Sequence, residues 1–148
     1  LGQLVGELRG EARLRAAHLH SRKKLALECP RLAAAFREEK RPYEVVRALG
    51  PGLYTGAYLA RAIQGGHEVV LRVLRPEYAL QPMIRGQFLR VSLTAVPMVH
   101  QNLVLTRHAE ELADIGLCYA VRDYVHGATL REVLESGRTF SREQAVKL

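Results

Sequence analysis

The sequence predicts an α+β fold, and two of its features point to it. Short runs rich in β-branched and aromatic residues, separated by glycine-containing turns, begin at residue 43. Apolar residues at helical spacing precede, interrupt and follow these runs. With 148 residues, 48% of them hydrophobic, the chain is long enough for one compact core. We therefore expect a basic helical appendage over residues 1–42 and one α+β domain over residues 43–148.

Most of the formal net charge of +7 lies in the appendage, where ten Lys/Arg stand against five Asp/Glu. Leucines at three- and four-residue spacing over residues 1–28 predict an amphipathic helix, and Pro30 fits the first turn of a second helix over residues 31–39. The basic stretch "SRKK" at 21–24 could contact nucleic acid or an acidic membrane, or it could be a solvated helix face. We favour the solvated face, because no aromatic residue lies between the basic ones to stack on bases.

From residue 43 the pattern predicts a three-strand antiparallel meander, a helix, two further strands and two short helices. The strands are "YEVVRAL" (43–49), "AYLARAI" (57–63), "HEVVLRVL" (67–74), "NLVLTRHA" (102–109) and "IGLCYAVRDYV" (115–125). The first helix spans 82–96 and stops at Pro97. The later helices lie within 126–137 and 141–148, and each opens with Thr or Ser as its N-cap.

Cysteine usage and hydropathy indicate a soluble, cytoplasmic protein. Cys29 and Cys118 lie 89 positions apart, with neither a CxxC motif nor a histidine at zinc-site spacing, so we expect two reduced packing residues. No apolar run approaches the roughly 18 residues that a membrane span requires.

Four stretches in this order resemble the N-terminal lobe of a bacterial-type serine/threonine protein kinase domain. They are "YEVVRALGPGLYTGAYLA" (43–60) for two strands and the glycine-rich loop, "EVVLRVLRPEYA" (68–79) for the third strand, "FLRVSLTAVPMVHQNLV" (88–104) for the regulatory helix and the step into the fourth strand, and "YAVRDYVHGATLREVL" (119–134) for the fifth strand, the hinge and the next helix. The resemblance implies a five-stranded antiparallel sheet with one regulatory helix, a hinge and the first helices of a second lobe. It also implies that His100 and Asn102 form a structural turn.

In that family, backbone amides of the glycine-rich loop approach the phosphates of ATP. Gly50 and Gly52 match the first two glycines, and Thr55 occupies the position of the third. Gly56 restores flexibility one residue later, and Ala57 stands where a branched residue covers the adenine. Phosphate contact and an ordinary hairpin turn both remain open for this loop.

The ion pair of active kinases is missing at the matching positions. Arg72 occupies the position of the phosphate-holding lysine, where it could hold phosphate or be a strand residue that reaches to solvent. Val91 occupies the position of the helix glutamate, and no Asp or Glu occurs anywhere from Tyr78 to Ala109. We expect Val91 to pack into the core instead.

The hinge positions carry an unusual charge. The resemblance places Asp123 at the hinge acid, Tyr124 and Val125 at the adenine-contacting backbone, and Arg122 at the gatekeeper. A guanidinium behind the adenine pocket needs a partner and fills space that the base would use. Asp114 and a ligand phosphate are the two candidate partners of Arg122.

The family's His-Arg-Asp catalytic loop and Asp-Phe-Gly metal motif would lie beyond residue 148. We therefore expect this polypeptide to have no catalytic base, no metal ligands and no phosphoryl transfer. The favoured function is that of a pseudokinase in signalling, which binds a protein partner on the apolar lower face of the lobe and holds ATP weakly or not at all. The alternative is the N-terminal part of a longer active serine/threonine kinase, with Mg²⁺ bound only if a second lobe follows.

Overall fold

The computed structural model describes residues 20, 23–24 and 26–147 and contains one five-stranded antiparallel sheet. The strand order is β1-β2-β3-β5-β4, and every neighbouring pair is antiparallel. The strands are β1 (Tyr43–Pro51), β2 (Thr55–Ala62), β3 (Glu68–Leu74), β4 (Thr106–Leu112) and β5 (Leu117–Asp123). The predicted fold class is confirmed.

The helices of the domain are α2 (Pro76–Ala79), α3 (Pro82–Ala95), α4 (Leu130–Glu135) and α5 (Arg142–Val146), and a 3-10 turn, η1, spans Ala113–Ile115. The predicted caps of the last two helices are confirmed. Thr129 and Ser141 each accept a hydrogen bond from the third backbone amide of the helix, and the side chain at that position bonds back to the cap. The sequence prediction missed α2.

The fourth strand begins later than predicted. A turn occupies residues 100–103, in which the Asn102 amide donates to His100 Nδ1 at 3.1 Å and the Leu103 amide donates to the His100 carbonyl at 3.0 Å. This turn uses the backbone groups that a longer strand would have paired, so β4 starts at Thr106.

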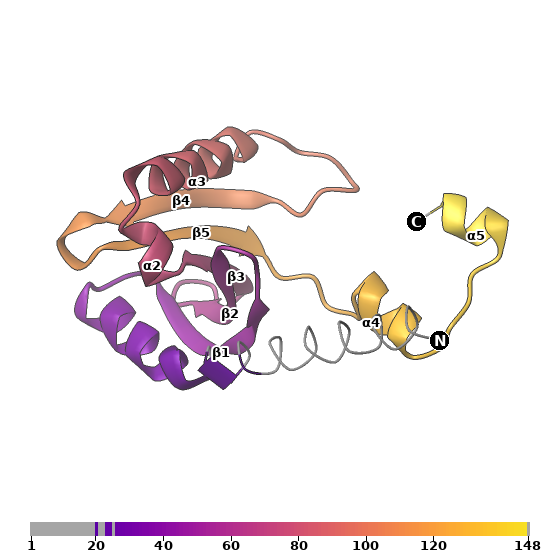
Figure 1. Ribbon diagram of the computed structural model, residues 1–148, viewed down its shortest axis with the longest axis horizontal. Coiled ribbons are helices and arrows are strands. Elements are labelled where there is room, and N and C mark those ends of the chain that lie inside the picture. Colours follow the sequence, from indigo (N-terminus) through magenta and orange to yellow (C-terminus); the bar gives the residue numbers. More distant parts are fainter. Residues whose placement is uncertain (1–19, 21–22, 25, 148) are drawn as a thin grey trace, which may run out of the picture.

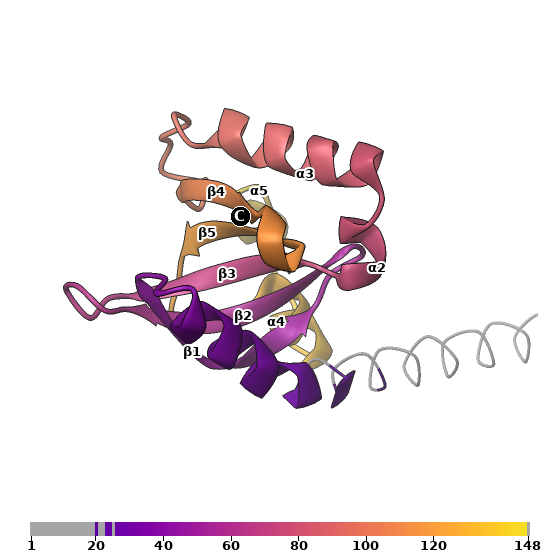
Figure 2. The same ribbon diagram turned by 90° about the vertical axis from the view of Figure 1, so that its left-hand side faces the viewer.

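The sheet lies between two helices, as Figure 2 shows: α3 covers one face and the helix over residues 26–38, coloured indigo, covers the other. Leu32 and Phe36 of the indigo helix reach the main core, which the alternate residues of the strands supply. Those strand residues are Val45, Tyr58, Ala60, Val69, Leu71, Val73, Tyr119 and Val121. We call this the core face of the sheet.

The predicted helix start at Pro30 is wrong. Residues 26–38 are helical without interruption, so Pro30 lies inside the helix. The apolar residues that face the core, Cys29 and Leu32 among them, follow helical spacing across Pro30 and favour one continuous helix. Pro30 itself is exposed, so water can reach the backbone carbonyl that lacks its amide partner. The predicted helix over 1–28 lies largely outside the described residues.

The second face of the sheet is only partly covered. Leu74, Ala79 and Cys118 form a smaller core against Phe88 and Leu89 of α3. Cys118 is buried and both cysteines are free, as expected.

The expectation that Val91 packs into the core is wrong, because its side chain is 57% exposed. On α3 only Ser92 is fully buried, so the helix contacts the sheet along a narrow stripe that Val91 does not share.

The chain leaves the sheet after β5, and α4 and α5 stand apart from it (Figure 1). Neither helix contains a buried residue. Within the described residues, no helix is both long and apolar enough to cross a membrane.

Candidate functional site

The glycine-rich loop is a tight hairpin between β1 and β2. Gly50 pairs with Ala57 and Pro51 with Gly56, which leaves only Gly52–Tyr54 to make the turn. The Gly52 amide donates to the Thr55 carbonyl at 2.7 Å and closes the turn. Two register irregularities in β1 precede it.

Arg72 reaches this hairpin from β3. Its Nη2 donates to Thr55 Oγ1 at 3.0 Å. A Cβ on Gly52 would lie 2.8 Å from Thr55 Oγ1 and 3.6 Å from Arg72 Nη2, so the backbone at Gly52 lies directly against this hydrogen-bonded pair. The space beneath the glycine turn is therefore occupied by a guanidinium of the protein itself.

A second arginine holds the same turn. Arg75 Nη2 donates to the Gly52 carbonyl at 2.6 Å. Sequence reasoning missed this residue, because its role depends on a hydrogen bond between positions 23 residues apart. The sequence feature that pointed to Arg75 was its position as a basic residue directly after the third strand.

Strand register brings Arg72 and Arg122 to one face of the sheet. Arg72 pairs with Ala57 on one side and Ala120 on the other, and Val70 pairs with Arg122. Side chains alternate between faces along a strand, so these residues share the face opposite the main core. We call this face, with Thr55, Ala57, Val70, Arg72, Ala120 and Arg122, the arginine face.

The two arginines interact unfavourably. Burial lowers the pKa of Arg72, and the positive charge of Arg122 lowers it further. Arg122 Nε is buried and has no hydrogen-bond partner among the described residues. Of the two candidate partners of Arg122, Asp114 does not pair with it, since Asp114 lies exposed in η1 and no ion pair joins the two side chains.

The other predicted site residues lie elsewhere. The strand position of Gly56 is on the core face, where this residue lines a cavity of about 340 Å³ together with Tyr58 and Leu32. Asp123 Oδ1 accepts from Arg107 Nε at 2.5 Å, and its amide donates to the Leu105 carbonyl at 3.0 Å. The structure thus brings Gly52, Thr55, Ala57, Arg72 and Arg122 together, whereas Gly56 and Asp123 face away.

At the hinge, Val125 is 65% exposed. Tyr124 packs edge-on against His126, with ring centroids 4.8 Å apart.

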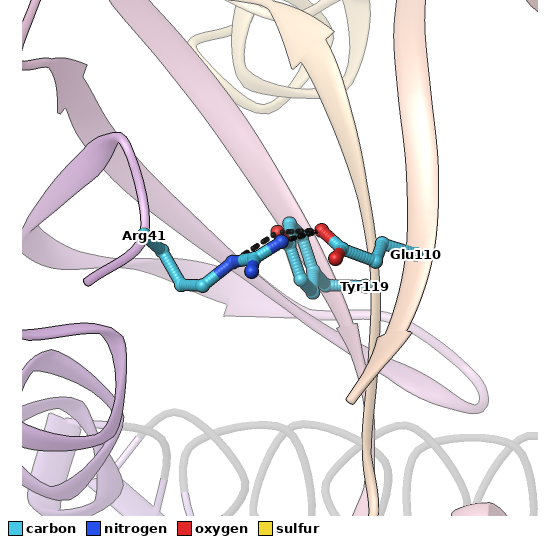
Figure 3. Close-up of polar contacts among 3 residues, drawn as sticks. All are labelled: Arg41, Glu110 and Tyr119. Carbon is cyan, nitrogen blue, oxygen red and sulfur yellow. Dashed lines mark hydrogen bonds and ion pairs between the residues drawn. The ribbon is translucent and has the colours of Figure 1, made fainter. Parts of the chain in front are cut away.

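A polar cluster on the core face joins the N-terminal helix segment to the far strands (Figure 3). The Tyr119 hydroxyl donates to Glu110 Oε2 at 2.7 Å, and Arg41 Nε donates to the same hydroxyl at 3.3 Å. Arg41 also forms an ion pair with Glu110. Burial works to raise the pKa of Glu110, but the hydrogen bonds from Tyr119 and Arg41 outweigh it and hold the pKa below its usual value. The cluster ties the segment before β1 to β4 and β5.

A five-stranded antiparallel sheet with α3 on one face, a glycine hairpin between its first two strands and a following hinge segment is the fold of a protein kinase N-terminal lobe. Solved structures agree. The kinase domain of Mycobacterium tuberculosis PknI matches with a TM-score of 0.62 at 22% identity, over 72% of this chain and 43% of that one. A double mutant of the same domain matches with a TM-score of 0.56 at 25% identity, over 65% and 37%.

Sequence similarity leads to the same class. The chain is 31% identical over 108 residues to a probable serine/threonine-protein kinase, SCO3848, of Streptomyces coelicolor, and 33% identical over 109 residues to PknB of Mycobacterium leprae. It is 30% identical over 106 residues to PrkC of Bacillus subtilis. Each match covers 72% of this chain but only 16–17% of the relative. No protein-family model matches.

In sequence and in fold, this chain resembles the N-terminal lobe of a bacterial-type serine/threonine protein kinase domain. It spans about a sixth of the length of the curated relatives it matches.

Proposed function

We propose that this lobe belongs to a pseudokinase, a kinase-like protein that acts in signalling by binding another protein rather than by transferring phosphate. The observation that carries the proposal is the engagement of Arg72 at the lysine position. Its guanidinium bonds to Thr55 beneath the glycine turn, where the family places ATP phosphates. A nucleotide would have to displace this contact before its phosphates could approach the loop.

The exposure of Val91 supports the same proposal. Active kinases need a lysine and a helix glutamate in register, because phosphoryl transfer depends on positioning and on neutralising phosphate charge. At the glutamate position Val91 is 57% exposed, and no acidic residue lies from Tyr78 to Ala109 to replace it.

Exposed apolar side chains support the protein-binding part of the proposal. Large apolar side chains are exposed on α3, on the loop that follows it and on α4. They are Met83, Val91 and Leu93 on α3, Met98, Val99, Leu103 and Val104 in the loop, and Leu130 and Leu134 on α4. We propose that a second, kinase-type lobe or a protein partner covers them, since the matched PknI kinase domain is more than twice as long as the part this chain covers.

The test is phosphoryl transfer from radiolabelled ATP by the purified full-length protein, with an active bacterial serine/threonine kinase as positive control. We expect no transfer from the wild type. Transfer that disappears in Arg72→Ala would reject the pseudokinase proposal, because it would show that Arg72 works on ATP.

The second candidate is an active kinase that uses Arg72 in place of lysine. It is supported by the permanent positive charge of Arg72 on the face that the family uses for ATP, and by relatives that are themselves named as kinases. This candidate requires an intact catalytic loop and metal motif downstream in the gene, whereas the pseudokinase proposal does not.

A further inference from the structure

We propose that Arg72 and Arg122 together bind a phosphate-type oxyanion on the arginine face and disfavour a nucleobase there. The inference rests on the proposed function in one respect: it names the ligand class of the same face and takes ATP not to be its productive ligand. Nothing in the kinase-like fold requires a second cation at position 122.

The register places the two guanidinium groups within reach of one ligand. Arg72 and Arg122 lie on neighbouring strands. Arg122 is two residues from Ala120, the direct partner of Arg72, so the two arginines are diagonal neighbours on one face with Cβ atoms roughly 7–8 Å apart. Arg72 is flanked on both sides by alanines, Ala57 and Ala120, whose short side chains leave space above the sheet. Both arginines are partly exposed, so a ligand can reach them from solvent.

Among the described residues, no carboxylate forms an ion pair with Arg72 or Arg122. Glu44, Glu68 and Glu111 are the strand carboxylates whose positions share the face. Glu44 pairs with Arg61 in the register of β1 and β2, Glu68 Oε2 lies 3.2 Å from His126 Nε2, and Glu111 Oε1 lies 3.2 Å from Arg85 Nε. Arg122 forms no ion pair with the described residues, and its Nε is a buried donor without an acceptor there. Burying such a donor is unfavourable, whereas an oxyanion would supply several acceptors at once.

The same residue disfavours a nucleobase. By the resemblance, Arg122 is the gatekeeper behind the adenine pocket, where the family binds an apolar ring. A charged guanidinium at that point occupies the volume of the ring and would lose solvation against it without gaining an acceptor. A phosphate group makes paired N–H···O contacts with the planar guanidinium. We therefore expect the phosphate part of a nucleotide to be recognised and the base to be rejected.

The experiment is calorimetric titration of the full-length protein with inorganic tripolyphosphate, ATP and adenosine, in EDTA so that no magnesium is bound. We expect tripolyphosphate to bind at least as tightly as ATP, and adenosine not to bind. ATP binding tenfold tighter than tripolyphosphate, or any saturable adenosine binding, would overturn the proposal.

Variants assign the binding to the two arginines. Arg72→Gln and Arg122→Gln should each weaken tripolyphosphate binding at least tenfold, while Arg47→Gln, an exposed arginine on β1, should leave it unchanged. Equal loss in all three variants would show only non-specific charge attraction and would overturn the proposal.

Thermal unfolding without any anion gives a second readout. Arg122→Met should raise Tm, because it removes an unpartnered buried donor and the repulsion with Arg72. A lower Tm would assign Arg122 a structural role instead. Different results contradict the two proposals. Absence of tripolyphosphate binding would contradict this inference, whereas phosphoryl transfer from ATP would contradict the proposed function.

Discussion

Arg72 shows how one side chain can fill the space beneath a glycine hairpin. A lysine ammonium is a compact point charge, whereas arginine carries five donors on a planar group. At this position one donor reaches Thr55 Oγ1 across the β2–β3 pair, and the others remain on the arginine face. The residue therefore connects the turn to the sheet and leaves donors for a ligand.

The two glycines of the hairpin should respond differently to alanine. Gly52→Ala forces Thr55 Oγ1 out of a 2.8 Å contact and breaks its bond to Arg72, so we expect a loss of about 1–3 kcal/mol in unfolding free energy. At Gly50 a new Cβ meets nothing within 4 Å, so Gly50→Ala should stay within about 0.5 kcal/mol of wild type. Urea denaturation of both variants measures this, and equal effects would contradict the packing at Gly52.

The cluster of Arg41, Glu110 and Tyr119 should make stability depend on pH. Because the folded pKa of Glu110 is below its unfolded value, its contribution is complete above about pH 4.3 and is lost as pH falls through the folded pKa. Glu110→Gln should cost about 1 kcal/mol at neutral pH. The gap between wild type and variant should close in acid, as followed by denaturation at several pH values. A gap that is constant with pH would show that the carboxylate charge contributes nothing.

At the scale of elements, the helix over residues 26–38 behaves as part of the lobe. Phe36 packs edge-on against Tyr119, with centroids 4.9 Å apart, and both rings are fully buried. The predicted boundary at residue 42 remains a prediction about domains, but in packing this helix shares one core with the sheet.

Truncating Phe36 tests that packing. Phe36→Ala removes a ring that is 1% exposed and leaves a cavity beside Tyr119, so we expect a loss of about 3–5 kcal/mol. Arg37→Ala, at the exposed neighbouring position of the same helix, should change stability by less than about 0.5 kcal/mol. Thermal unfolding of both variants measures the difference in stability. A small effect of Phe36→Ala would mean that the helix is not held on the sheet in solution.

At the scale of the whole molecule, the packed part of the chain consists of three layers: the helix over residues 26–38, the sheet and α3. Residues 124–147 lie outside these layers, with most side chains exposed and α4 and α5 apart from the sheet (Figure 1). Their short helices depend on local caps rather than on packing.

Amide hydrogen exchange of the 148-residue chain should show this division. We expect slow exchange in β2, β3 and β5, whose residues form the main core, and fast exchange throughout 124–147. Mass spectrometry of peptic fragments resolves the two regions. Protection of α4 equal to that of β3 would mean that another surface, such as a second copy, already covers it.

Local patterns in the sequence were enough to predict the five strands, α3 and both helix caps, because alternation, helical spacing and cap residues act between neighbours in the chain. They were also enough to place Arg72 on the third strand, Arg122 on the fifth strand and Val91 on the helix between the third and fourth strands.

Only the tertiary structure decided what those positions do. Val91 lies outside the narrow contact of α3, the helix runs through Pro30 because its core-facing stripe continues, and Arg75 and Arg41 bond to residues far along the chain. Above all, the absence of an ion pair for Arg122 among the described residues depends on strand register and on where Glu68 and Glu111 find their partners. Such contacts join residues distant in sequence, so no local pattern encodes them, and packing alone determines which charges are paired.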